Sequence, residues 1–141
     1  MIEYRMRSNL SKPSVFIVEG FQHIGEGIPH WHLTVRPHVW RPPTDVYETD
    51  EGLVVRIEVA GMNENDFSIL VDGRYLSVRG VRTEAPERRA YHQMEIRFGE
   101  FMSDIELPFE IDTEKIEAVY QSGFLRIILP KKAPQHISIQ R

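Results

Sequence analysis

Cysteine is absent from this sequence of 141 residues, and so are long apolar runs. Without cysteine the chain can form no disulfide, no thiolate nucleophile and no cysteine-based zinc site, which is typical of a reducing compartment. The longest aliphatic and aromatic runs are about four or five residues, far below the ~20 that cross a bilayer as a helix. The opening "MIEYRMRSNLSK" lacks the apolar core and cleavage site of a signal peptide. We therefore expect a soluble, cytoplasmic protein without a membrane partner.

Excess positive charge is also missing. The formal net charge is −4, and residues 40–131 carry 11 Lys and Arg against 18 Asp and Glu. Residues 1–39 are nearly balanced, with four basic and three acidic residues. Because a nucleic-acid surface depends on clustered basic side chains, this distribution argues against a nucleic-acid partner.

The common catalytic motifs are missing together. The chain contains no G-x-x-x-x-G-K-[ST], no G-x-S-x-G and no H-E-x-x-H. We therefore predict no enzyme activity, no catalytic residue and no cofactor. The enzyme alternative is a metal-dependent hydrolase built on the histidines at 23, 30, 32 and 38, which metal analysis of the purified protein would test. No third ligand has diagnostic spacing, so we favour exposed histidines and predict no metal site.

Residues 1–39 mix short apolar pieces with residues that interrupt regular structure. Glycine stands at 20, 25 and 27, and proline at 13, 29 and 37. Such spacing leaves little room for a long helix or a self-contained core. We interpret this part as a flexible, apolar N-terminal arm, which ends where "RPPTD" forces an extended entry into the next segment.

After the arm, apolar residues recur with a period of two. In "LVVRIEV", the residues at 53, 55, 57 and 59 share one face, and "FSILVDGRYLSVRG" predicts a hairpin around Asp72-Gly73. The segments "FMSDIELP", "IEAVY" and "FLRIILP" alternate in the same way. Short alternating strands between turn residues predict an all-β fold, an antiparallel immunoglobulin-like β-sandwich.

Two segments do not fit a closed sandwich. Eighteen residues lie between Gly80 and Gly99, and they include the β-capable stretch 91–96, which needs an edge to pair with. Near the end of the chain, Ile137 and Ile139 flank one serine and would point the same way in an extended strand. Two exposed isoleucines in a polar tail are either accidental in a disordered segment or a docking motif, and their spacing favours docking.

These stretches together resemble the small heat-shock protein (Hsp20) family with its α-crystallin domain. The matching segments are "PPTDVYETDEGLVVRIEVAGM", "ILVDGRYLSVRG", "YHQMEIRFGEFMSDIELP" and "AVYQSGFLRIILPK", and the terminal "ISI" matches the family's I-x-I tail. The last long segment carries the A-x-x-x-x-G-x-L-x-I-x-L-P-K pattern at Ala118, Gly123, Leu125, Ile127, Leu129, Pro130 and Lys131. The resemblance divides the chain into an arm, 1–39, an α-crystallin domain, 40–131, and a tail, 132–141.

The resemblance implies an ATP-independent holdase chaperone that binds unfolding proteins and works as an exchanging homo-oligomer of strand-swapped dimers. The exchanged strand would hold Tyr91, His92, Met94, Glu95 and Ile96, paired with a partner's Asp45, Val46 and Tyr47. The tail residues Ile137 and Ile139 would enter a groove formed by Ile69, Val71, Ile116 and Ala118 of another dimer. The implied partners are unfolding client proteins, further copies of the chain, and ATP-dependent refolding chaperones.

Candidate client-binding side chains lie in the arm, which cannot cover all of its own apolar surface. They are Phe16, Phe21, Ile24, Trp31 and Leu33. The same residues could instead pack between subunits, and the sequence leaves both roles open. A second functional reading is a co-chaperone module of the CS/p23 type. It predicts a monomer without the strand-bearing loop or the I-x-I tail, both of which this chain has.

Two positions depart from the family pattern. Serine 103 stands where the family's G-x-F-x-R motif commonly has arginine, and Arg97 is displaced by one from the usual E-R pair. The ionic contacts that relatives make with these arginines are therefore not carried over to this chain. The fold prediction is unaffected, because Ser103 changes no hydrophobic pattern.

Overall fold

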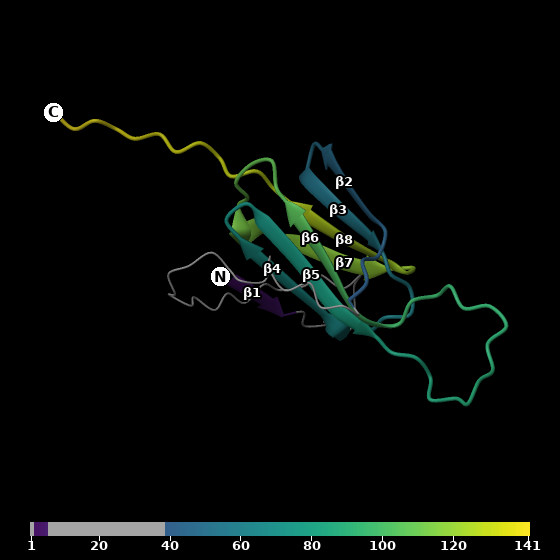
Figure 1. The fold of residues 1–141 in the computed structure, drawn as a ribbon. Helices are drawn as coiled ribbons and strands as arrows, with labels where there is room; N and C mark the ends of the chain where they lie inside the picture. Colours follow the sequence, from purple (N-terminus) through teal and green to yellow (C-terminus); the bar gives the residue numbers. More distant parts are fainter. Residues whose placement is uncertain (1, 6–38) are drawn as a thin grey trace.

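The computed structural model describes residues 2–5 and 39–141 (Figure 1). Eight strands and two short 3-10 turns, at Glu64–Asp66 and Thr113–Lys115, are the regular elements of this described part. The strands are β1 (Ile2–Arg5), β2 (Thr44–Thr49), β3 (Gly52–Glu58), β4 (Phe67–Asp72), β5 (Tyr75–Arg82), β6 (Gly99–Glu106), β7 (Glu117–Gln121) and β8 (Phe124–Leu129). Within the described residues, none forms a helix with the length and hydropathy needed to cross a membrane.

The strands form two antiparallel sheets that pack face to face. One sheet has the order β1-β4-β5-β6 and the other β2-β3-β8-β7. Ring centroids of Phe67 on β4 and Tyr120 on β7 lie 5.0 Å apart. At the other side of the sandwich, the hydroxyl oxygens of Thr44 on β2 and Ser103 on β6 lie 3.1 Å apart. The predicted antiparallel β-sandwich is therefore confirmed.

The core lies between the sheets and follows the period-two pattern. The core residues on β3 alternate as Leu53, Val55 and Ile57, although Val54 between them is buried as well, and the inward residues of the other strands continue one cluster. Phe101 is its largest fully buried side chain, and its ring lies 5.6 Å from that of Trp40 in the same cluster. Trp40 is only 8% exposed, although the sequence pattern marked it as the boundary of the domain and not as part of the core.

The turns of two hairpins position the strands. The hairpin between β4 and β5 exists as predicted, but its two-residue loop is Gly73-Arg74, one residue later than expected. Gly73 has φ +58°, which favours glycine at the first position of such a loop. The hairpin between β7 and β8 turns through Ser122 and Gly123, whose φ values are +52° and +81°. Both loops match the turn types whose twist suits antiparallel strands.

Strand β1 adds a fourth strand to the first sheet. It runs antiparallel to β4, with Ile2 paired to Val71 and Arg5 paired to Ser68. These residues belong to the predicted arm, for which the sequence pattern indicates no strand. A segment far from β4 in sequence thus covers the edge of β4 (Figure 1).

Candidate functional site

The outer edge of β2 ends the second sheet, and no other strand of the described residues pairs with it. Val46 is paired with Val55, which is fully buried, and therefore lies on the core-facing side of β2. Its side chain is nevertheless 44% exposed. A bare strand edge beside an exposed apolar side chain is a template for a further strand. The predicted residues Asp45, Val46 and Tyr47 all lie on this strand.

Charged and aromatic side chains order the outer face of β2. Arg56 on β3 donates to Asp45 over 2.6 Å, and this hydrogen bond raises the pKa of the Arg56 guanidinium above its ordinary value. The guanidinium also lies 5.6 Å from the ring centroid of Tyr47 and 5.9 Å from that of Phe124. The ion pair is exposed and adds little stability, but together these contacts fix the direction of the strand's polar face.

The loop between β5 and β6, residues 83–98, projects from one end of the sandwich (Figure 1). The predicted strand 91–96 is not part of any described sheet, and its residues lie within this projecting loop. Tyr91, Met94 and Ile96 are 48%, 61% and 65% exposed, and His92 and Glu95 are exposed as well. Met94 and Ile96 would share one face of a strand, so the segment has the pattern that a bare strand edge accepts.

Hydrogen bonds within the loop tie its first half together. Arg89 forms ion pairs with Glu84, at 2.8 Å, and with Glu87, at 3.0 Å. The Tyr91 hydroxyl hydrogen-bonds with both Arg89 and Glu84. The hydrogen bonds with Tyr91 and then Glu87 raise the pKa of Arg89 above its ordinary value. These contacts hold residues 84–91 as one unit, which carries the exchange candidate Tyr91.

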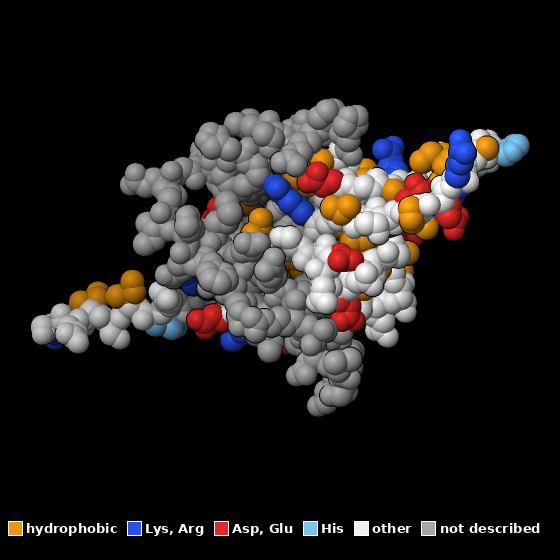
Figure 2. Space-filling view, turned by 90° about the horizontal axis from the view of Figure 1, so that it is seen from below, with side chains coloured by type: hydrophobic (Ala, Val, Ile, Leu, Met, Phe, Trp, Pro, Cys, Tyr) orange, Lys and Arg blue, Asp and Glu red, His pale blue; other side chains and the backbone are white. Residues whose placement is uncertain are grey.

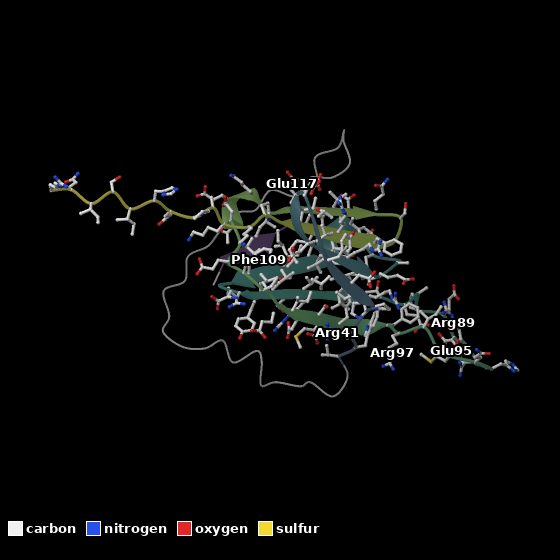
Figure 3. All side chains as sticks on the ribbon, turned by 90° about the horizontal axis from the view of Figure 1, so that it is seen from above. Arg41, Arg89, Glu95, Arg97, Phe109 and Glu117 are labelled. Carbon is white, nitrogen blue, oxygen red and sulfur yellow. The ribbon has the colours of Figure 1, made fainter. Side chains whose placement is uncertain are left out.

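Arg82 fixes the base of the loop. Its guanidinium lies 4.5 Å from the Trp40 ring centroid and 5.5 Å from that of Phe98. It donates to the carbonyl oxygen of Arg97 over 2.8 Å and to that of Ala60 over 3.3 Å. Beside it lies an open hollow of about 680 Å³, whose lining includes the labelled residues Arg41, Glu95 and Arg97 (Figure 3). Arg82 thus joins the two ends of the loop, a role that the sequence analysis missed.

The predicted groove residues come together where β4 and β7 face each other across the core. Ile69 and Val71 on β4 are 3% and 1% exposed, and Ile116 and Ala118 before and within β7 are 6% and 4% exposed. All four belong to one core cluster. The edge of β4 beside them is paired with β1. Their role in binding a tail stays a prediction.

The tail extends away from the sandwich after a fixed root (Figure 1). Lys131 pairs with Ile111, and the Lys132 amide donates to the Glu110 carbonyl oxygen over 3.0 Å. Beyond this root, Ile137 and Ile139 are 89% and 92% exposed. Figure 2 shows hydrophobic side chains on the tail at one end of the molecule and on the loop at the other. The structure therefore presents apolar side chains on two separate projections.

Ser103 occupies the position of the family's arginine. It is fully buried on β6, and its hydroxyl lies 3.1 Å from that of Thr44, so one hydrogen bond links the two sheets. From the sequence, Ser103 stands out only as a departure from the family pattern. A signal for this role was present, because Ser103 is the polar inward position between Phe101 and Ile105. A buried hydroxyl at such a position needs a partner.

Other predicted residues lie outside the described part of the chain. These are the client-binding candidates Phe16, Phe21, Ile24, Trp31 and Leu33, and the arm histidines at 23, 30, 32 and 38. Among residues 2–5 and 39–141, no three His, Cys, Asp or Glu side chains gather in a group that could hold a metal ion.

The described residues thus form an antiparallel β-sandwich domain with an outer β2 edge, a projecting loop and a projecting apolar tail. Comparison with known proteins identifies the family: residues 45–141 match the Hsp20/alpha crystallin family. The match covers more than half of the chain, and the chain belongs to this family. The resemblance stated from the sequence is thereby confirmed.

Relatives share the domain but are longer than the aligned part. "Small heat shock protein C2" of Rickettsia felis is 37% identical over 93 residues, which are 64% of this chain and 60% of that protein. "Heat shock protein 16" of Schizosaccharomyces pombe is 33% identical over 94 residues, or 64% of this chain and 66% of that protein.

Solved structures give the same assignment. The structure of heat shock protein 16.0 from Schizosaccharomyces pombe is similar with a TM-score of 0.62 and 26% identity, covering 77% of this chain and 81% of that one. The structure of hspA from Xanthomonas axonopodis gives a TM-score of 0.61 with 28% identity, covering 66% and 95%. The family is one of small heat shock proteins, which supports a chaperone role.

Proposed function

We propose that this chain is an ATP-independent holdase that binds unfolding proteins and prevents their aggregation, without enzymatic chemistry. The observation that carries the proposal is the exposure of apolar side chains on projecting segments, with Ile137 and Ile139 about nine-tenths exposed. Exposed apolar residues that alternate on extended segments are typical of surfaces that pair with other chains. Membership of the Hsp20/alpha crystallin family supports a chaperone as the reason for such surfaces.

The proposed dimer forms by exchange of the loop strand. Residues 91–96 of one copy pair with the outer edge of β2 of another copy, next to Val46. The partly exposed Val46, Met94 and Ile96 supply the apolar contact, and backbone hydrogen bonds supply the rest. The contact of Arg82 with the Trp40 ring supports the exchange, because it fixes the direction in which the loop leaves β5.

The proposed higher assembly forms when tails dock on other dimers. Ile137 and Ile139 would cover the facing edges of β4 and β7 near Ile69 and Ala118. One tail alone gives marginal affinity, but several tails in a closed assembly bind at raised effective concentration. Such an assembly is stable as a whole and still exchanges subunits, so arm residues can meet clients. Refolding of released clients would fall to separate ATP-dependent chaperones.

Light scattering of a heat-labile client protein tests the proposed function. In the absence of nucleotide, an equimolar amount of this chain should suppress the rise in scattering on heating. The substitution Trp31→Ser with Leu33→Ser should weaken suppression, because it removes apolar arm side chains. The matched control His30→Ser with His32→Ser changes alternate positions of the same segment and should keep it.

Two results would count against the proposal. Full aggregation of the client at equimolar chain would contradict holdase activity itself. Loss of suppression in the histidine control alone would favour the histidine-based alternative, and metal analysis of the purified protein would then decide that question.

A further inference from the structure

The edge of β4 is the point where the proposed tail docking meets an obstacle within the chain. β4 has two edges, and β5 pairs with one of them from Phe67↔Gly80 to Asp72↔Tyr75. β1 pairs with the other, from Arg5↔Ser68 to Ile2↔Val71. A strand offers hydrogen-bonding groups along two edges only. In this structure both edges of β4 are therefore in use.

The residues of β1 have the spacing of the tail motif. Ile2 and Tyr4 are two residues apart, as are Ile137 and Ile139. In the register, Ile2 stands opposite Val71 and Tyr4 opposite Ile69. Val71 and Ile69 are the two β4 positions of the predicted tail groove. β1 and the tail therefore have the same spacing of apolar residues, and both are placed opposite Ile69 and Val71.

We propose that β1 and the tail of a second copy compete for the outer edge of β4, so that β1 acts as an internal blocking strand. This inference rests on the proposed tail docking. The occupant is a second copy's tail, residues 136–140, because that segment is extended, exposed and apolar at alternate positions. β1 is four residues long and ends the sheet, so its displacement breaks pairing with one strand only.

Competition links two events that are otherwise independent. Each tail that docks on β4 must displace one β1, and by reciprocity a bound β1 weakens tail binding by the same factor. The apparent dissociation constant of the tail is its intrinsic constant divided by the fraction of chains with a free β4 edge. Residues 6–38, which carry the client-binding candidates, follow β1 directly. Tail docking therefore detaches the arm from the sandwich at its first strand.

Binding of a tail peptide measures the competition. The probe is a fluorescein-labelled peptide of residues 132–141, followed by anisotropy. The acceptor is the full chain with Ile137→Ser and Ile139→Ser, so that its own tails do not compete with the labelled peptide. A second acceptor also carries Glu3→Pro and Tyr4→Pro. Only alternate residues of β1 donate a backbone hydrogen bond to β4, and proline has no N–H to donate. Two consecutive prolines therefore remove a β1–β4 hydrogen bond whichever of the two residues is the donor. The matched control adds Glu3→Gln and Tyr4→Phe, which keep both backbone amides.

The proline acceptor should bind the peptide at least about threefold more tightly than the parent, and the control acceptor should bind like the parent. In the parent, added peptide should also speed amide exchange of residues 2–5 while β4 stays protected. Equal affinities together with unchanged exchange at residues 2–5 would overturn the competition and leave tail docking in place. Absence of binding to all three acceptors would overturn tail docking itself, and the inference with it.

Discussion

Replacing both tail isoleucines by serine should dissociate the proposed higher assembly into dimers. In the isolated chain Ile137 and Ile139 are 89% and 92% exposed, so nearly all of each side chain is free to become buried on docking. Full burial of one isoleucine contributes about 1.5–3 kcal/mol, and the pair about 3–6 kcal/mol. At about 1.4 kcal/mol for each tenfold change, removal of both weakens each tail contact by roughly 10² to 10⁴.

The assay is mass by size exclusion with light scattering on the full chain at micromolar concentration. The Ile137→Ser, Ile139→Ser variant should elute as dimers while the wild type elutes as a larger species. The matched control is Ser138→Ala, which changes the residue between them and should leave the mass unchanged, because Ser138 would point away from the groove. An unchanged mass in the double variant would refute the reasoning, since the predicted loss per contact is too large to go unseen.

Two further predictions concern the sandwich. In the Ile137→Ser, Ile139→Ser background, where dimers are expected, adding Val46→Arg should give monomers by sedimentation, because it places a charge beside the outer edge of β2. Adding Thr49→Arg, at the end of the same strand, should leave dimers, and dimers with both substitutions would contradict the proposed exchange. Ser103→Arg should lower the free energy of unfolding in urea by about 3–5 kcal/mol, because the position is fully buried, whereas Ser103→Ala should cost about 0.5–1.5 kcal/mol. Wild-type stability of the arginine variant would mean that the position opens to solvent.

Most strands of the core could be predicted from the sequence because burial imposes a period of two. Leu125, Ile127 and Leu129 are fully buried, as the alternation in "FLRIILP" requires. The presence of a hairpin here also follows from that pattern, but its register does not, because Ile69 pairs with Val78 and not with Leu76. The turn was predicted one residue early, because Asp-Gly favours a turn in general whereas here the register closes over Gly73-Arg74.

Other features depend on contacts between distant residues, which local patterns do not record. Trp40 stands before two prolines without alternating neighbours, and its burial follows from its packing on Phe101. Strand β1 is too short to show a period and exists through its pairing with β4. Arg82 has an ordinary position at a strand end, and only the fold brings it onto Trp40 and Phe98.

The projecting segments divide into a part that the sequence predicts and a part that needs a second copy. The loop 83–98 lies between β5 and β6, the tail follows β8, and Ile96 and Ile139 are exposed on them. Their binding partners stay predictions. The pairing energy of an exchanged strand comes from contacts between two chains, and the hydrophobic periodicity of one sequence does not show which edge the strand pairs with.

The backbone pairing of Lys132 with Glu110 turns the tail into a tether with a fixed origin. From Lys132 to Ile137 the chain advances five residues, at most about 18 Å at ~3.3–3.6 Å per residue. Under the proposed docking, this length sets the maximum distance between the tail root on one dimer and the groove on the next. The number of residues between Lys132 and Ile137 would then limit the curvature of the proposed assembly, and with it the diameter.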